Sequence, residues 1–213
     1  EHAPEQMKEY LLRLFAGGYN TLYDAALCWI EPMPNPLEDA LEELRENHVE
    51  VDEPLFLEFF NAWMLHICDR SMALGHTIDD ARRSKVRALY DSYGLDESKE
   101  YFSRTMKDIM GWNKEACENA IWQRILKKYF LEPGRSDGGR LYIDISRVRP
   151  RYDENHTWFH CEKCAEYTPY LLRGKCPCCG ADTIHPMRDD EYHALDFWRR
   201  PIQEALDGAK IRD

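Results

Sequence analysis

Long hydrophobic runs are missing from this sequence. Across its 213 residues the uninterrupted apolar stretches are short, as in residues 62–65, whereas a membrane-spanning helix needs about 20 consecutive apolar residues. We therefore expect no transmembrane segment and no membrane partner. The first residue is Glu1, and no basic segment leading into an apolar one follows it. This start indicates that the sequence lacks a secretion signal and is a piece of a longer protein.

The motifs of several common enzymes are missing as well. The glycine-rich stretch 134–139 lacks the lysine of a phosphate-binding loop. The Gly-x-Ser-x-Gly turn of serine hydrolases and the His-Glu-x-x-His helix of metalloproteases do not occur. A Glu-x-x-His pair, which a carboxylate-bridged di-metal site would need, is also absent. These absences predict that this chain is not an enzyme by itself.

An overall excess of positive charge is missing too. The formal net charge is −11, which argues against a nucleic-acid partner because like charges repel. The charge is unevenly distributed, however: residues 1–80 hold 4 Lys and Arg against 17 Asp and Glu, and residues 121–151 hold 8 against 3. We therefore expect an acidic N-terminal surface and a basic middle with different partners. The acidic side chains of residues 38–58 are most simply a solvated face; the alternative is a face that docks a protein or mimics DNA.

Residues 1–131 are predicted to be almost wholly helical, because apolar residues recur at helical spacing and capping residues or glycines mark the ends. The helix that begins at Asp52 is rich in Phe and Leu, so we expect it at the centre of the core. The expected helices are about 4–16, 21–30, one that begins at 35, 52–74, one from 79 to 94, 97–110 and 114–131.

The pattern changes after Pro133. A glycine-rich turn at 134–139 is followed by alternation of Leu141, Ile143 and Ile145 with polar residues, which predicts a strand. The predicted fold is mainly α: a helical bundle with a winged-helix-like β-hairpin, then a small four-cysteine zinc ribbon and a C-terminal helix broken at Pro201. The expected parts are residues 1–131, 132–154, 155–187 and 188–213.

Five of the eight cysteines lie between Cys161 and Cys179. Two Cys-x-x-Cys turns, Cys161 with Cys164 and Cys176 with Cys179, supply the four thiolates that a structural zinc ion binds in a tetrahedron. Protein ligands would fill every position, so we predict one structural Zn²⁺ with no site for activated water. Clustered thiols also favour a reducing compartment, the cytoplasm.

Other residues near the two turns leave alternatives open. Cys178 is expected to be a spectator, because the pair Cys176 and Cys179 keeps the two-residue gap. His160 or His185 could replace one thiolate. The remaining thiols, Cys28, Cys68 and Cys117, are expected to be small buried apolar residues.

Basic and aromatic residues alternate through residues 121–175. Such residues can follow a phosphate backbone and stack on bases, so this region is a candidate for contact with DNA. The structural alternative is that the aromatic residues only fill the small core of the ribbon. The candidate nucleic-acid-binding residues are Arg140, Arg147, Arg149, Arg151, Tyr170 and Arg173.

Three segments between residues 140 and 201 resemble a known family. They are the arginine-rich strand 141–152, the cysteine turns 161–164 and 176–180, and the helical segment 196–201, Asp-Phe-Trp-Arg-Arg-Pro. Together they resemble the insert between the two motor lobes of large bacterial superfamily-2 helicases. Such helicases occur in phage-defence (antiviral) systems and are related to repair helicases with zinc-binding accessory domains.

The resemblance implies a non-catalytic accessory region that contacts DNA or positions the motor lobes. The ATP-binding motifs of that family are not in this chain, so the ATPase of the parent protein would lie elsewhere. The remaining helicase domains would then be partners. The residues alone also allow a protein-interaction adaptor, in which acidic helices dock a partner and the ribbon is purely structural.

Overall fold

The computed structural model describes residues 5–89, 92–96, 101–112, 115–135 and 139–210. Helices and three small antiparallel sheets make a mixed α and β fold. Among the described residues, no helix is both long enough and apolar enough to cross a membrane. The first half contains α1 (Glu5–Ala16), β1 (Cys28–Pro32), α2 (Pro34–Glu46), α3 (Glu53–Ser71), α4 (Asp80–Val86) and α5 (Arg104–Met110).

The second half begins with a continuous helical stretch of three parts: α6 (Glu115–Asn119), a π-helical segment η1 (Ala120–Leu126) and α7 (Lys127–Tyr129). Short strands follow, and two helices complete the chain. These elements are β2 (Leu131–Pro133), β3 (Leu141–Ile143), β4 (Val148–Tyr152), β5 (Phe159–Cys161), β6 (Tyr167–Thr168), β7 (Ile184–Pro186), α8 (Asp189–Ala194) and α9 (Asp196–Lys210).

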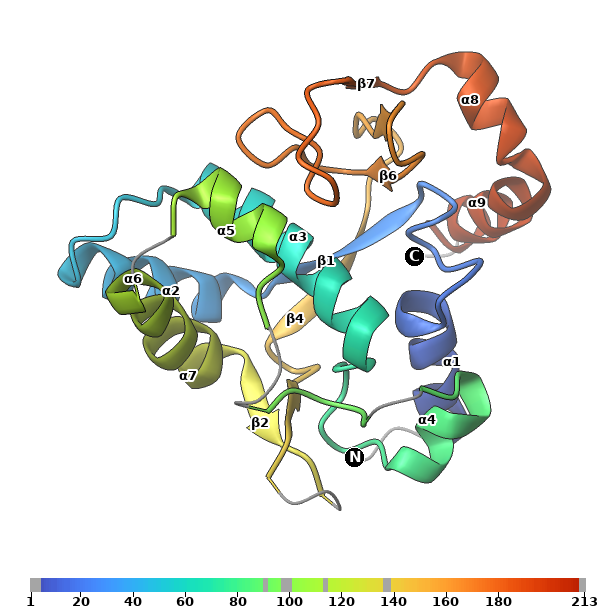
Figure 1. The fold of residues 1–213 in the computed structure, drawn as a ribbon. Helices are drawn as coiled ribbons and strands as arrows, with labels where there is room; N and C mark the ends of the chain where they lie inside the picture. The colour runs from blue at the N-terminus through green and yellow to red at the C-terminus, as the bar shows by residue number, and fades with distance from the viewer. Residues whose placement is uncertain (1–4, 90–91, 97–100, 113–114, 136–138, 211–213) are drawn as a thin grey trace.

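Helix α3 lies at the centre of the core, as the sequence predicted (Figure 1). The Asp52 carboxylate accepts a hydrogen bond from the backbone N–H of Leu55 at 3.0 Å, which caps the first turn. Aromatic side chains on α3 are fully buried and meet aromatic rings from distant elements. The ring centres of Phe60 and Phe130 are 4.8 Å apart, and those of Phe59 and Trp112 are 4.7 Å apart. Burial of this helix therefore joins η1, α5 and α7 into one core.

The prediction of a helix at residues 21–30 is wrong. Thr21 and Asp24 form a local turn: each backbone N–H donates to the side chain of the other, at 2.9 and 3.1 Å. Residues 28–32 are instead strand β1, which pairs antiparallel with β4 so that Glu31 lies opposite Arg149. The apolar run before Pro32 suits a buried strand as well as a helix. Pairing with a segment about 120 residues further along the chain decides between them.

Strands β2 and β3 pair antiparallel around the glycine-rich turn, as the sequence predicted. Strand β4 does not extend this hairpin, because a turn at Asp144 redirects the chain toward β1. The backbone N–H of Ser146 donates to the Asp144 carboxylate at 2.9 Å in this turn. Ile145, which the alternation placed in the strand, lies outside β3 and is partly exposed.

Other helix ends differ from the predictions. Helix α4 ends at Val86 and not at Gly94. Helix α5 begins at Arg104, with Ser103 as its cap; residues 101–103 precede it, and 97–100 lie outside the described residues. The predicted break at Pro201 is also wrong, because α9 runs through this residue and the helical chain is interrupted at Leu195. Ile202 and Leu206 of α9 pack on a cluster from residues 22–28, which holds the helix together beyond the proline.

A buried arginine joins the end of α3 to α4. Arg83 is fully buried, and its guanidinium donates to the backbone carbonyls of Met72, Leu74, Gly75 and Ile78 at 2.5–3.2 Å. It also lies over the Tyr142 ring, 4.1 Å from the ring centre. Because a buried carbonyl without a donor is costly, this side chain specifies the path of residues 72–78.

We expect Arg83→Met to lower the free energy of unfolding by about 3–5 kcal/mol, because four buried carbonyls lose a charged donor. Arg82→Ala is the matched control: Arg82 is next in the same helix, is partly exposed and pairs with Glu9. Arg82→Ala should lower the free energy of unfolding by less than about 1 kcal/mol. Chemical denaturation measures both, and equal losses for the two variants would contradict the role of Arg83.

Candidate metal centre

The four cysteines lie on two turns that connect the strands of a three-stranded sheet with strand order β6-β5-β7: one between β5 and β6, the other between β6 and β7 in the chain. Cys161 is the last residue of β5, and the turn after it closes when the Ala165 N–H donates to the Cys161 carbonyl at 2.8 Å. The second turn closes when the Gly180 N–H donates to the Cys176 carbonyl at 2.9 Å. Gly180 has φ +70°, a left-handed conformation that glycine adopts without strain.

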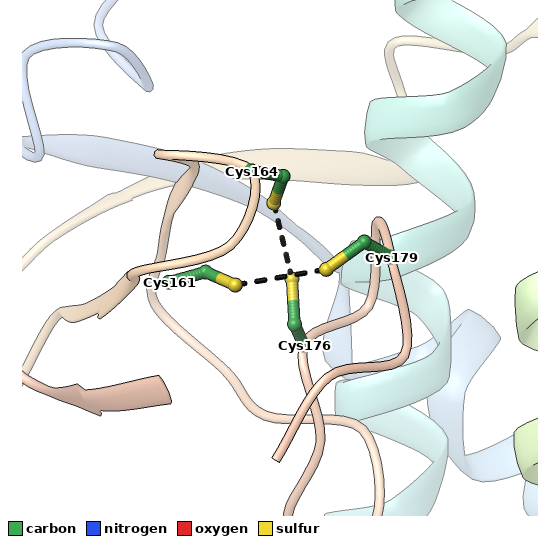
Figure 2. Close-up of side chains that lie close together, drawn as sticks. All are labelled: Cys161, Cys164, Cys176 and Cys179. Carbon is green, nitrogen blue, oxygen red and sulfur yellow. Dashed lines mark hydrogen bonds between the residues drawn. The ribbon is translucent and has the colours of Figure 1, made fainter. Parts of the chain in front are cut away.

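The four sulfur atoms converge, as the spacing of the two turns predicted (Figure 2). The Sγ atoms of Cys161 and Cys179 are 3.6 Å apart, those of Cys164 and Cys176 are 3.7 Å apart, and all four lie within 4.8 Å of one another. Zinc–thiolate bonds of about 2.3 Å in a tetrahedron separate the sulfurs by about 3.8 Å. The donor set and its spacing therefore fit one tetrahedral metal ion with little movement of the backbone.

The thiols of this cluster differ in their acidity. A hydrogen bond from the Cys178 thiol lowers the pKa of Cys176 to about 4, whereas burial raises the pKa of Cys164. The Cys164 thiol thus holds a proton that a metal ion must displace, so metal affinity falls as the pH falls.

The fifth thiol of the region, Cys178, is exposed and is not one of the four that converge. His160 and His185, the alternative ligands from the sequence, are not in this group either. They lie together with Glu191 in a second group of possible ligands. The sequence analysis missed this group as a unit; its one local signal is that His160 directly precedes Cys161. Elsewhere Cys28 and Cys68 are buried, as expected, and Cys117 is half-buried.

The ribbon (orange in Figure 1) is anchored on β1 and α3. Trp158 is buried against Tyr23 and Trp29, with ring centres 5.3 and 6.0 Å apart. The Tyr23 hydroxyl donates to the Thr168 hydroxyl at 3.0 Å. These contacts hold the metal centre at a fixed position on the helical body.

Three of the six predicted nucleic-acid-binding residues meet at one carboxylate. Arg149 and Arg151 of β4 lie 3.8 and 3.2 Å from Glu31 of β1, and the Tyr170 hydroxyl donates to Glu31 at 2.8 Å. Burial, with the Glu31 charge, raises the pKa of Tyr170, so its phenol remains a donor. The side chains of Arg149 and Arg151 are about 40% exposed.

The other three candidates lie apart from this group. Arg140 pairs with Asp96 at 3.9 Å, and Arg147 pairs with Asp144 at 3.6 Å. Arg173 is exposed, and its backbone N–H donates to the Glu58 carboxylate. The structure therefore brings Arg149, Arg151 and Tyr170 together and places the other three candidates elsewhere.

The acidic and basic stretches of the sequence touch in several places. Glu43 on α2 accepts hydrogen bonds from Lys128 and from the Tyr129 hydroxyl, at 2.5 and 3.0 Å. The bond from Lys128 is the main reason that the pKa of Glu43 lies below its usual value. Other carboxylates on and after α2 are exposed: Glu38, Asp39, Glu42, Glu46, Glu50, Asp52 and Glu53.

A cavity of about 550 Å³ lies between α1, α3 and the second cysteine turn. Glu166, Asp24, Asp69 and Cys178 contribute to its lining. Burial raises the pKa of Glu166 to about 7, and the neighbouring carboxylates of Asp24 and Asp69 add to this. Glu166 is thus largely protonated just below neutral pH, which limits the negative charge in this cavity.

Comparison of the chain with protein-family models, with curated proteins and with solved structures finds no match in any of the three. The resemblance to helicase inserts therefore stays a prediction, and the function has to be argued from the geometry of the site.

Cobalt(II) provides a direct test of the cysteine site, because thiolate ligands give it an intense charge-transfer absorption. We expect the wild-type chain to show this absorption and Cys161→Ser to lose it. Cys178→Ser should retain it, since Cys178 is not one of the four converging thiols. An intact absorption in Cys161→Ser, or its loss in Cys178→Ser, would contradict the assignment.

Proposed function

We propose that this chain is a non-catalytic, zinc-binding accessory domain that contacts nucleic acid, as in the helicase inserts that residues 140–201 resemble. The observation that carries the proposal is the spacing of the four sulfur atoms, 3.6 and 3.7 Å in the two closest pairs. Four thiolates fill a tetrahedral zinc site completely and leave no position for a reacting water. The ion is therefore structural, and the function is one of binding.

Zinc stabilises a part of the chain that has little core of its own. The described residues of the ribbon that are nearly fully buried include Trp158, Cys161, Leu172 and Cys176, and two of these are ligands. In so small a unit the free energy of metal binding is largely free energy of folding. Zinc then holds Tyr170 and its neighbours beside β4.

The surface proposed for nucleic acid is the arginine pair on β4. Arg149 and Arg151 are two residues apart on one strand, so they lie on the same face of the sheet. Glu31 pairs with both guanidinium groups, at 3.8 and 3.2 Å, and the three groups leave a local charge of about +1 at neutral pH. A guanidinium group can bind a phosphate through two parallel hydrogen bonds. The hairpin of β2 and β3 follows the helix formed by α6, η1 and α7, which is the order that a wing would have.

A second candidate is a protein-interaction adaptor. The observation that favours it is a groove of about 740 Å³ beside α2, which combines apolar side chains with acidic ones. Its lining includes apolar Leu41, Val49, Val51 and Leu55, acidic Glu50, Asp52 and Glu53, and basic Arg45 and His48. A basic amphipathic segment of a partner would match this surface.

Salt-dependent binding to a DNA duplex and to a single strand separates the two candidates. We expect binding at low salt that weakens as salt rises, and Arg149→Ala with Arg151→Ala should lower the slope of log K against log salt by about 0.9 per lost phosphate contact. Arg200→Ala is the control, since this exposed arginine pairs with Glu204 within α9. Glu31→Gln should tighten binding, because a negative charge next to both arginines is removed.

Absence of DNA binding at low salt would overturn the proposal and leave the adaptor as the better candidate. Equal losses for the β4 variants and for Arg200→Ala would show that binding depends on overall charge and not on the arginine pair. Cobalt absorption in each variant confirms that the ribbon is folded during the measurement.

A further inference from the structure

We infer that His160, His185 and Glu191 form a second metal site, which takes zinc or another borderline divalent cation. The inference does not depend on the proposed function. The two histidines are direct cross-strand partners, His160 on β5 and His185 on β7, and Glu191 lies in the first turn of α8. Their donor atoms all lie within 4.8 Å of one another. Side chains alternate along a strand, so His160 and Cys161 project to opposite faces of β5.

The hydrogen bonds of His185 identify its Nε2 atom as a free ligand. Its Nδ1 atom lies 2.9 Å from the Pro186 carbonyl, and a carbonyl only accepts, so Nδ1 carries the proton of the neutral ring. Nε2 is buried and has no hydrogen-bond partner among the described residues. Histidines that bind metals commonly donate their second N–H to a backbone carbonyl in this way.

The surroundings of this nitrogen are negatively charged. His185 Nε2 lies 3.7 Å from the Glu191 carboxylate and 3.7 Å from the Glu162 carboxylate. A nitrogen lone pair that faces two carboxylates is repelled by both unless a proton or a metal ion lies between them. A divalent cation would satisfy all three groups at once, and Glu162 could serve as a fourth ligand.

Glu191 and His160 are held in position by other contacts. The Glu191 carboxylate accepts hydrogen bonds from the Arg188 backbone N–H at 2.8 Å and from the Arg188 guanidinium at 3.3 Å, and it contacts His160 Nδ1 at 2.5 Å. A metal ion would displace the proton that His160 and Glu191 share in this contact. The His160 ring stacks on Tyr167, with ring centres 4.8 Å apart. The side chains of His160 and His185 are 20% and 26% exposed, so an ion can reach the site from solvent.

The donor set indicates the class of ion and the strength of its binding. Two imidazoles and a carboxylate suit zinc and similar transition metals better than calcium or magnesium. Bonds of about 2.0–2.1 Å in a tetrahedron place such donors about 3.4 Å apart. The Glu191 carboxylate lies 2.5 Å from His160 Nδ1 and 3.7 Å from His185 Nε2. Each distance must therefore change by less than about 1 Å when a metal ion binds. The sulfur cluster needs almost no change, so we expect the histidine site to bind more weakly and to exchange its ion.

Titration of the untagged full chain with Co²⁺, and then with Zn²⁺, tests the inference. We expect two equivalents to bind: the first with thiolate charge-transfer absorption, the second with only weak ligand-field bands. His185→Ala and Glu191→Gln should each retain the first equivalent and lose the second, so that the stoichiometry falls from two to one. His193→Ala is the control, since this exposed histidine in α8 pairs with Asp196 at 3.0 Å, and the variant should retain both equivalents.

The thiolate absorption reports separately on the cysteine site, so loss of the second equivalent alone is specific to the histidine site. Binding of a single equivalent by the wild-type chain would overturn the inference, as would two equivalents in both His185→Ala and Glu191→Gln. If His185→Ala also loses the thiolate absorption, Glu191→Gln decides, because its amide oxygen can still accept from the Arg188 N–H. Cys178→Ser should retain the second equivalent. Loss of the second equivalent in this variant would show that the Cys178 thiol binds that ion, and would overturn the inference.

Discussion

The antiparallel pairing of β1 with β4 determines where everything else in this molecule lies. It joins residues 28–32 to residues 148–152, and the Glu31 carboxylate on β1 then holds Arg149, Arg151 and the Tyr170 hydroxyl. Trp29 of the same strand packs against Trp158 at the start of the ribbon. A mostly buried carboxylate is costly without partners, and these donors offset that cost. One strand pair thus connects the helical body, the arginine strand and the metal centre.

Acidic and basic segments that are separate in the sequence contact each other in the fold. The acidic first third and the basic middle are not separate surfaces, because Glu43 pairs with Lys128 and Glu31 with Arg149 and Arg151. The surfaces that we propose for partners are smaller: the partly exposed arginine pair on β4 and the exposed carboxylates of α2. Net charge alone describes neither of them.

The ribbon sheet carries two groups of possible metal ligands, one on each side of β5. The cysteine group already has the spacing of a tetrahedral zinc–thiolate site, which suits an ion that is bound once and retained. The group of His160, His185 and Glu191 has a looser spacing and a buried nitrogen, His185 Nε2, without a hydrogen-bond partner among the described residues. An ion there would connect β5 and β7 to α8, so its binding would also affect the helix that leads into α9.

The sequence by itself determined the features that depend on neighbouring residues. The capped start of α3 at Asp52, the glycine-rich turn between β2 and β3 and the convergence of the four cysteines follow from local spacing and turn chemistry. Only the tertiary structure decided that residues 28–32 form a strand, that α9 continues through Pro201, that Arg83 is buried among four carbonyls and that His160 meets His185 and Glu191. Each of these depends on partners that are distant in the chain or on side-chain placement after packing, and local propensity carries no information about either. The physical reason is the same throughout: a few non-local contacts outweigh the small local preferences that the sequence makes visible.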